Sequence, residues 1–213
     1  MPLQNRVAPD GSLHSDRARG MFTGNRGIIH DPATKTLSGR RWSTPAWICC
    51  SLKFGERKRE VWGRNHFGKN GPAAGWSELF FCDEVTALAA GHRPCFFCRR
   101  EDAKRFIAAS AHENARSCDN ALHQERWLSS SVPPQRLSAI DLPGLPDGTV
   151  IKAGEQYFAL KDRKALEWDF SGYGRGFGLG ELLRQSLLLV SPSTMVNALR
   201  SGYRPVWHAT ALT

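Results

Sequence analysis

The chain has 213 residues, of which 41% are hydrophobic and 10% aromatic, so it can bury the core of one large domain or of two small ones. No apolar run approaches the ~20 residues of a membrane span, and the first twenty residues are polar and charged. We therefore expect no membrane partner, no secretory signal and a cytoplasmic location. In such a reducing compartment the six cysteines would serve metal binding or catalysis and not disulfides.

The net charge of +9 is concentrated in the first part of the chain. Residues 1–75 hold 13 Lys or Arg against 5 Asp or Glu, whereas residues 76–130 hold 7 against 8. A basic region of this kind suits a polyanion, most simply nucleic acid. We expect a nucleic-acid partner, with DNA as the first candidate and a nucleoid-associated location to match. A basic surface without a dedicated partner is the alternative.

Residues 1–20 are rich in polar and turn-forming residues and predict a flexible N-terminus. The first apolar strand is expected at residues 47–54, and it carries adjacent cysteines, Cys49 and Cys50. Because side chains alternate between the faces of a strand, only one of these two thiols can easily face a given site.

A second strand is expected at residues 60–63, which makes a hairpin with a charged tip. The tip carries Arg57, Lys58 and Arg59, which we expect to contact nucleic acid. The basic pair Arg99 and Arg100, which follows the next cysteine motif, is expected to do the same.

The residues from Ala87 to Cys98 combine a helix end, a turn and a Cys-x-x-Cys pair. Gly91 suits the left-handed residue that ends a helix, and Pro94 prevents its continuation. Cys95 and Cys98 then fall on the turn. A redox pair needs a thioredoxin-like pattern before it, which is missing, whereas a zinc site needs two further thiolate or imidazole ligands. The best donors are Cys50 and then Cys49, so we expect Zn²⁺ held by Cys50, Cys95, Cys98 and Cys49.

Residues 76–104 resemble the zinc-binding N-terminal domain of the Ada family of alkyl-DNA repair proteins. The matching positions are Ala87 to Gly91, Arg93, Pro94, Cys95 and Cys98. The family's first cysteine pair is Cys-x-x-x-Cys, whereas the cysteines upstream here are adjacent. The resemblance implies a role in DNA damage response or alkyl-phosphotriester repair. It also implies that Cys50 or Cys49 is a zinc-bound nucleophile that accepts a methyl group.

The region after the cysteine motif predicts two helices. Apolar residues recur at helical spacing over residues 99–115, and Asp119 is suited to cap a second helix that ends near Leu128. Asp119 and His123 are four residues apart and share a helix face, and Glu125 is close by. These three residues could act in general acid–base catalysis, and they define the alternative of a metal-stabilised hydrolase or nuclease. A capped helix with solvent-facing charges is the structural alternative, and whether the chain catalyses anything stays open.

Proline-rich segments near residues 132–146 suggest a boundary, so we expect a zinc-binding domain at 21–131. Residues 147–213 then form an α+β C-terminal domain or an extension of the first. Strands are expected at 149–151, 156–160 and 166–170, and the Gly-rich run 172–180 is read as a flexible connector.

The end of the chain repeats part of the cysteine motif. Ala198 to Pro205 reads Ala-Leu-x-x-Gly-aromatic-Arg-Pro, as does Ala87 to Pro94. The second copy has no cysteines after it, so the repeated residues can be architectural and independent of metal.

The sequence thus predicts an α+β fold with small mixed and antiparallel sheets, short helices and a zinc-clipped N-terminal half. The leading functional hypothesis is a zinc-containing, DNA-associated protein. A hydrolase or nuclease and a non-enzymatic interaction domain are the alternatives.

Overall fold

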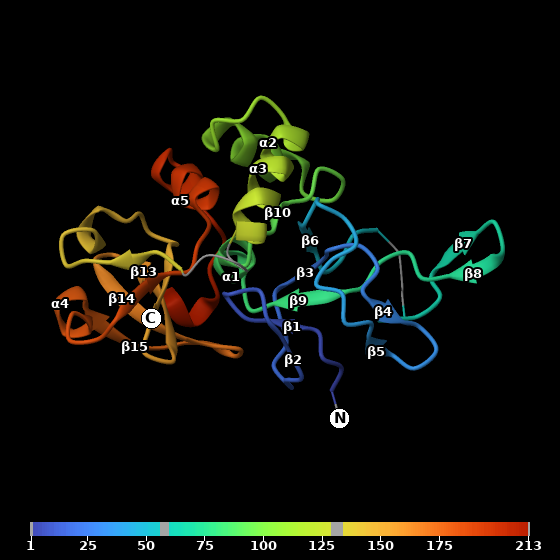
Figure 1. The fold of residues 1–213 in the computed structure, drawn as a ribbon, viewed down its shortest axis with the longest axis horizontal. Coiled ribbons are helices and arrows are strands. Elements are labelled where there is room, and N and C mark those ends of the chain that lie inside the picture. The colour runs from blue at the N-terminus through green and yellow to red at the C-terminus, as the bar shows by residue number, and fades with distance from the viewer. Residues whose placement is uncertain (1, 56–59, 129–133, 213) are drawn as a thin grey trace.

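The structure is a computed structural model that describes residues 2–55, 60–128 and 134–212. Two six-stranded sheets follow one another along the long axis, with helix α1 between them (Figure 1). The fold class is α+β, as the sequence predicts. None of the helices in these ranges is long and apolar enough to cross a bilayer.

The N-terminal sheet is mixed. Its strand order is β10-β6-β3-β9-β1-β2, with β1 parallel to β9, β6 parallel to β10, and the other neighbours antiparallel. Its strands are β1 (Arg6–Val7), β2 (Leu13–His14), β3 (Phe22–Asn25), β6 (Ile48–Ser51), β9 (Leu79–Phe81) and β10 (Arg93–Pro94).

The C-terminal sheet is antiparallel throughout, in the order β11-β16-β12-β13-β14-β15. Its strands are β11 (Arg136–Leu137), β12 (Val150–Ala153), β13 (Gln156–Lys161), β14 (Lys164–Asp169), β15 (Gly172–Gly178) and β16 (Leu187–Leu189).

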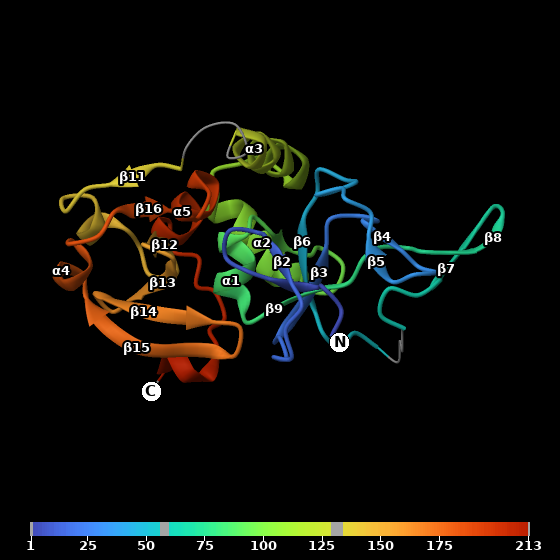
Figure 2. The same cartoon turned by 60° about the horizontal axis from the view of Figure 1, so that its bottom comes forward.

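Two small hairpins extend from the N-terminal sheet, and the second of them projects far from the body (Figures 1 and 2). They are β4 (His30–Asp31) with β5 (Thr36–Leu37), and β7 (His66–Gly68) with β8 (Gly71–Ala73). The α-helices in the described ranges are α1 (Glu84–Ala89), α2 (Arg100–Ala109), α3 (Ala115–Leu128), α4 (Leu179–Leu182) and α5 (Ser193–Arg200).

Helix α1 joins the two halves of the molecule, and every one of its residues is buried. Its N-cap, Asp83, accepts hydrogen bonds from the Thr86 amide at 2.9 Å and from the Tyr173 hydroxyl at 2.9 Å. Glu84 accepts one from the Tyr203 hydroxyl at 2.6 Å. Two tyrosines of the C-terminal half therefore bind the start of α1. The predicted domains 21–131 and 147–213 meet at this helix.

The repeated sequence motif forms the same helix end twice. After α1, Gly91 has φ of +82° and the His92 amide donates to the Ala87 carbonyl at 2.8 Å. After α5, Gly202 has φ of +99° and the Tyr203 amide donates to the Ala198 carbonyl at 3.0 Å. Glycine is needed in both places because the left-handed conformation is costly for residues with a Cβ. The motif is thus an element of helix termination that does not require metal.

Two segments expected to be irregular are ordered strands. Residues 1–20 supply β1 and β2, and Val7 is fully buried while β1 pairs with β9. The Gly-rich run forms β15 beside β14, with Leu166 opposite Gly176. Cross-strand hydrogen bonds and burial outweigh the flexibility that the composition suggests.

Other boundaries also differ from those expected. Residues 60–63 form a turn and not a strand: Trp62 is buried with φ of +59°, and its indole N–H donates to the Glu78 carbonyl at 2.9 Å. The helix predicted over 99–115 ends at Ala109. Helix α3 starts at Ala115, where Asn114 accepts a hydrogen bond from the Ser117 amide at 3.0 Å, so Asp119 is not an N-cap.

Candidate metal centre and its pocket

Strand β6 places its two cysteines on opposite faces of the N-terminal sheet. Cys50 lies opposite Thr23 on β3, and Thr23 lies opposite Phe80 on β9, so these three side chains share one face. Cys49 lies on the other face, in the buried cluster that includes Ala87 of α1. This is the alternation that the sequence predicts for a regular strand.

Strand β10 brings the Cys-x-x-Cys turn beside Cys50. Pro94 lies opposite Cys49 in the parallel pair, and the Cys95 amide donates to the Cys49 carbonyl at 2.9 Å. The chain then turns, and the Arg99 amide donates to the Cys95 carbonyl at 2.9 Å as α2 begins. The turn therefore projects Cys95 and Cys98 to the same side of the sheet as Cys50.

The donor atoms of Cys50, Cys95 and Cys98 all lie within 4.8 Å of one another. A tetrahedral zinc with Zn–S bonds near 2.3 Å holds its sulfurs about 3.8 Å apart, so the cluster can close on such an ion with small movements. A donor set of three thiolates favours a soft or borderline metal over Mg²⁺ or Ca²⁺. Within the described ranges these three cysteines form the group suited to a metal, and Cys49 is not part of it.

The three thiols influence one another's ionisation. Hydrogen bonds from Cys50 and Cys98 lower the pKa of Cys95, and the Phe97 amide donates to the Cys95 sulfur at 3.4 Å. The hydrogen bonds that Cys50 makes to Cys95 and Cys98, together with burial, raise the pKa of Cys50. The pKa values of Cys95 and Cys50 thus shift in opposite directions, and a bound cation would favour the thiolate form of all three cysteines.

Cys49 has a structural environment. It is fully buried, its sulfur accepts a hydrogen bond from the Arg99 guanidinium at 3.5 Å, and burial raises the pKa of its thiol. A buried, protonated thiol is a poor nucleophile and a poor ligand. The expectation that Cys49 completes the metal site is therefore not supported by this arrangement.

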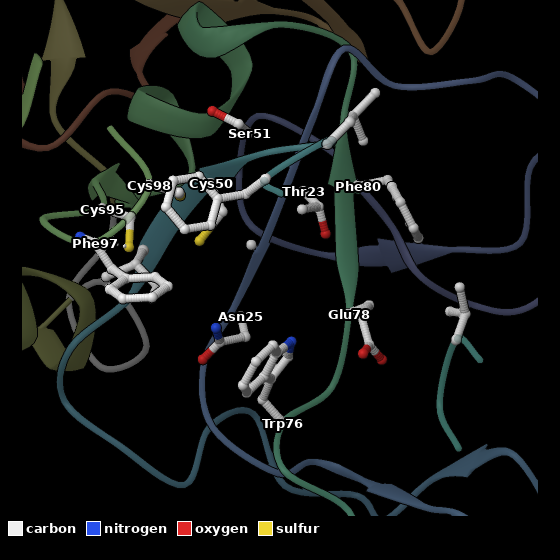
Figure 3. A pocket seen from close by; sticks show the side chains of 15 residues that line it. Thr23, Asn25, Cys50, Ser51, Trp76, Glu78, Phe80, Cys95, Phe97 and Cys98 are labelled. Atoms are coloured by element: carbon white, nitrogen blue, oxygen red, sulfur yellow. Dashed lines mark hydrogen bonds between the residues drawn. The ribbon is translucent and has the colours of Figure 1, made fainter. Parts of the chain in front are cut away.

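The cysteine cluster opens into a pocket of about 520 Å³ on the sheet face that α1 does not cover. All three cysteines line it, together with aromatic and polar side chains that include Trp76, Phe97, Asn25 and Glu78. Figure 3 shows the cysteines and Phe97 at one end of the pocket and Trp76 and Glu78 at the other. An ion bound by the three thiolates would thus border a space large enough for a small organic group.

The residues of the catalytic alternative do not line this pocket. Asp119 pairs with Arg93, and Glu125 accepts a hydrogen bond from the Thr194 hydroxyl at 2.7 Å at the start of α5. His123 packs edge-on against Trp42 at 5.4 Å between ring centroids. The three side chains contact three different parts of the chain, so the structure does not bring them together as one site.

Of the five basic residues expected to contact nucleic acid, the structure describes two, Arg99 and Arg100. Arg57, Lys58 and Arg59 lie outside the described residues. Arg100 is exposed at the start of α2. Arg99 is not available for a phosphate, because it is 6% exposed and pairs with Glu84 at 2.8 Å.

Glu84 also stabilises the charge of Arg99. Burial lowers the pKa of the Arg99 guanidinium, but the hydrogen bond and charge of Glu84 outweigh burial, so its pKa is raised overall. Arg99 therefore stays charged and holds α2 against the start of α1.

Several pocket residues were not identified from the sequence. Thr23, Asn25 and Glu78 reach the pocket because β3 and β9 pair with each other beside β6. The continuous apolar run Leu79–Phe81 predicts a buried strand but does not show which face reaches the pocket. The pairing of strands about 25 to 55 residues apart was also not predictable, because register between distant strands depends on the whole fold.

Comparison of the chain with protein-family models, with curated proteins and with solved structures found no match. The function must therefore be argued from the site itself.

Proposed function

We propose that this is a zinc-containing, DNA-associated protein in which Cys50, Cys95 and Cys98 hold the metal and Cys50 is a nucleophile that accepts an alkyl group. The observation that supports this most directly is the position of the three sulfurs, within 4.8 Å of one another on the wall of a 520 Å³ pocket. Zinc bound to thiolates keeps them deprotonated at neutral pH while they remain nucleophilic.

Three protein thiolates leave the fourth position of a zinc ion open, so hydrolysis by a zinc-bound water is the reaction that competes with alkylation. A side chain that accepts the proton of this water would assist hydrolysis. Among the described lining residues the one carboxylate is Glu78, directly before β9, and there is no histidine. Cys50 lies opposite Thr23, and Thr23 opposite Phe80, so Glu78 is more than two strand spacings, about 10 Å, from Cys50. Alkylation of Cys50 needs no such group.

The proposed step is balanced without a further reactant. The Cys50 thiolate attacks the methyl carbon of a methyl phosphotriester, the C–O bond breaks and a C–S bond forms. The oxygen keeps the electron pair and leaves as a phosphodiester anion. Because the thioether that forms is stable, each chain would react once.

The experiment compares Cys50→Ser with the matched control Cys49→Ser. Zinc-loaded protein is incubated with DNA that carries methyl phosphotriesters, and peptides are analysed by mass spectrometry. We expect one methyl group per chain on Cys50 in the wild type and in Cys49→Ser, and none in Cys50→Ser. Repeated DNA cleavage by unmodified protein would contradict the proposal and favour the nuclease.

A second candidate is a non-enzymatic interaction domain, favoured by the rim of the pocket. Phe97 is 65% exposed and Phe54 44% exposed, and their rings contact each other at 4.9 Å between centroids. Exposed aromatic side chains of this kind are common at binding surfaces. Binding of DNA that is abolished by Phe97→Ser, without methyl transfer in any condition, would support this candidate over the first.

A further inference from the structure

A cluster of three arginines surrounds Trp47, on the side of the N-terminal sheet away from the pocket. The guanidinium carbons of Arg26, Arg126 and Arg41 lie 4.0, 4.2 and 5.8 Å from the centroid of the Trp47 ring. We call these four residues the Trp47 arginine cluster. None of them lines the metal pocket.

The cluster gathers positive charge in a buried place. Arg26 is 1% exposed, and burial followed by the charges of Arg41 and Arg126 lowers its pKa well below the usual value. Neither Arg26 nor Arg41 forms an ion pair within 4.0 Å among the described residues. The charge of Asp10 acts on both Arg26 and Arg41, and its carboxylate accepts hydrogen bonds from Ser12. Like charges held together in this way are unfavourable unless an anion accompanies them.

The guanidinium groups of Arg26 and Arg41 both lie close to Gly11. Gly11 has φ of +84°, and a Cβ placed on it would lie 3.4 Å from an Arg26 nitrogen and 3.9 Å from an Arg41 nitrogen. The absence of a side chain at Gly11 thus lets both guanidinium groups approach the same point. Gly11 and Arg26 are buried and Arg41 is exposed, so Arg41 is the member of this group that solvent reaches.

The cluster also contains a buried donor without an acceptor. Trp47 is 1% exposed, and within the described part of the chain its indole N–H has no hydrogen-bond partner. A buried donor of this kind is costly, and most are satisfied in folded proteins. An anion with several oxygen atoms could accept from the indole and from the guanidinium groups at the same time.

We propose that the Trp47 arginine cluster is a binding site for one phosphate group, with Arg41 as its solvent-facing ligand and Arg26 and Trp47 as its buried ones. The hydrogen bonds that Arg26 and Arg41 already make leave N–H groups that can donate to a phosphate. Arg26 uses Nε on His92 and one Nη on the Gly11 carbonyl, and Arg41 uses one Nη on the Arg126 carbonyl. The site does not depend on the metal centre.

The test uses inorganic phosphate at constant ionic strength, with chloride as the reference anion. Binding is followed by calorimetry and by the ¹⁵N–¹H signals of the tryptophan indoles. We expect one phosphate per chain and a shift of one indole signal, which is the signal missing from Trp47→Phe. Arg41→Ala should weaken binding by about tenfold or more, whereas its exposed neighbour Arg40→Ala should leave it unchanged.

Two results would overturn the proposal: no phosphate binding by the wild type, or equal affinity in Arg41→Ala and Arg40→Ala. Arg41→Lys keeps the charge and should recover part of the affinity, which separates loss of a ligand from loss of fold. A single-stranded oligonucleotide then identifies the source of the phosphate. Competition with inorganic phosphate assigns the site to a nucleic-acid backbone, and lack of competition assigns it to a free phosphate or monoester. Methyl transfer to Cys50 is measured separately and can fail without affecting this result.

Discussion

Cys49 and Cys50 are neighbours in the chain, but their thiols lie on opposite faces of β6. Cys50 reaches the other two cysteines of the cluster, whereas Cys49 is buried against α1 and Arg99. We therefore expect Cys50→Ser to lose most of its zinc and Cys49→Ser to retain it. The measurement is the zinc content of protein purified under reducing conditions, by elemental mass spectrometry. Equal zinc content in the two variants would contradict this assignment.

Removal of the metal should destabilise the N-terminal half. Structural zinc contributes directly to folding because the unfolded chain has no preformed site. We expect a strong chelator to lower the melting temperature of the wild type, with recovery when zinc is added back. Cys95→Ser should melt near the temperature of the chelated wild type, and the chelator should not lower it further. A wild type that melts at the same temperature with and without chelator would show that the cysteines do not hold a stabilising ion.

The site was more predictable from sequence than the fold around it. The Cys-x-x-Cys spacing and the alternation along β6 are local properties, and they pointed to Cys50, Cys95 and Cys98, but the expected ligand set also included Cys49, which lies outside the cluster. The pocket was not predictable, because it depends on β3 and β9 pairing beside β6. The Gly-rich run that forms β15 was also mispredicted. Its local propensity favours a loop, but pairing with β14 makes it a strand, and that pairing is known only from the fold.

Charged residues were the least predictable part of the sequence. Arg99 looked like a surface cation beside a metal site, but it is buried on Glu84. Asp119 and Glu125 were expected to act with His123 in catalysis, but each holds a different element in place. The partners Glu84, Arg93 and Thr194 are distant in sequence from these side chains, so their roles follow from tertiary contacts that the local pattern does not contain.

His92 should make stability dependent on pH. Its ring is fully buried, and the Arg26 Nε donates to its Nε2 at 3.1 Å, which requires the neutral ring. Burial, with the charges of Arg26 and Arg126, lowers the pKa of His92 well below 6.5. The unfolded chain therefore binds a proton near pH 6.5 that the folded chain does not bind. The contribution of His92 to stability is complete above pH 6.5 and is lost as the pH falls below it.

The test is denaturant unfolding between pH 5 and pH 7.5, a range of about one unit or more on each side of the usual histidine pKa. The free energy of unfolding of the wild type should fall towards pH 5, and His92→Gln should show a smaller dependence on pH. The exposed His66 provides the control, and His66→Gln should keep the slope of the wild type. Identical slopes in the wild type and His92→Gln would show that His92 is not the group responsible.

Arg93 and Asp119 should contribute to stability as a pair. Arg93 donates through Nε and Nη2 to the two oxygens of Asp119 at 2.8 and 2.7 Å, and the side chains are only 7% and 11% exposed. Breaking a buried pair leaves one charge without its partner and costs about 3–5 kcal/mol. We therefore expect Arg93→Ala and Asp119→Ala each to lower the free energy of unfolding by that amount. The double variant Arg93→Met with Asp119→Leu should lose less than the sum of the two, because it leaves no buried charge.

The same variants separate a structural Asp119 from a catalytic one. If Asp119 acts only through Arg93, any DNA cleavage or methyl transfer by the protein should persist in the double variant, provided that it is measured below the temperature at which that variant unfolds. If Asp119 acts in catalysis, Asp119→Asn should abolish activity while keeping most of the stability, since the amide retains one hydrogen bond to Arg93. Denaturant unfolding and activity measured on the same preparations distinguish the two cases. We expect the first, because Asp119 faces Arg93 and does not line the pocket beside the cysteines.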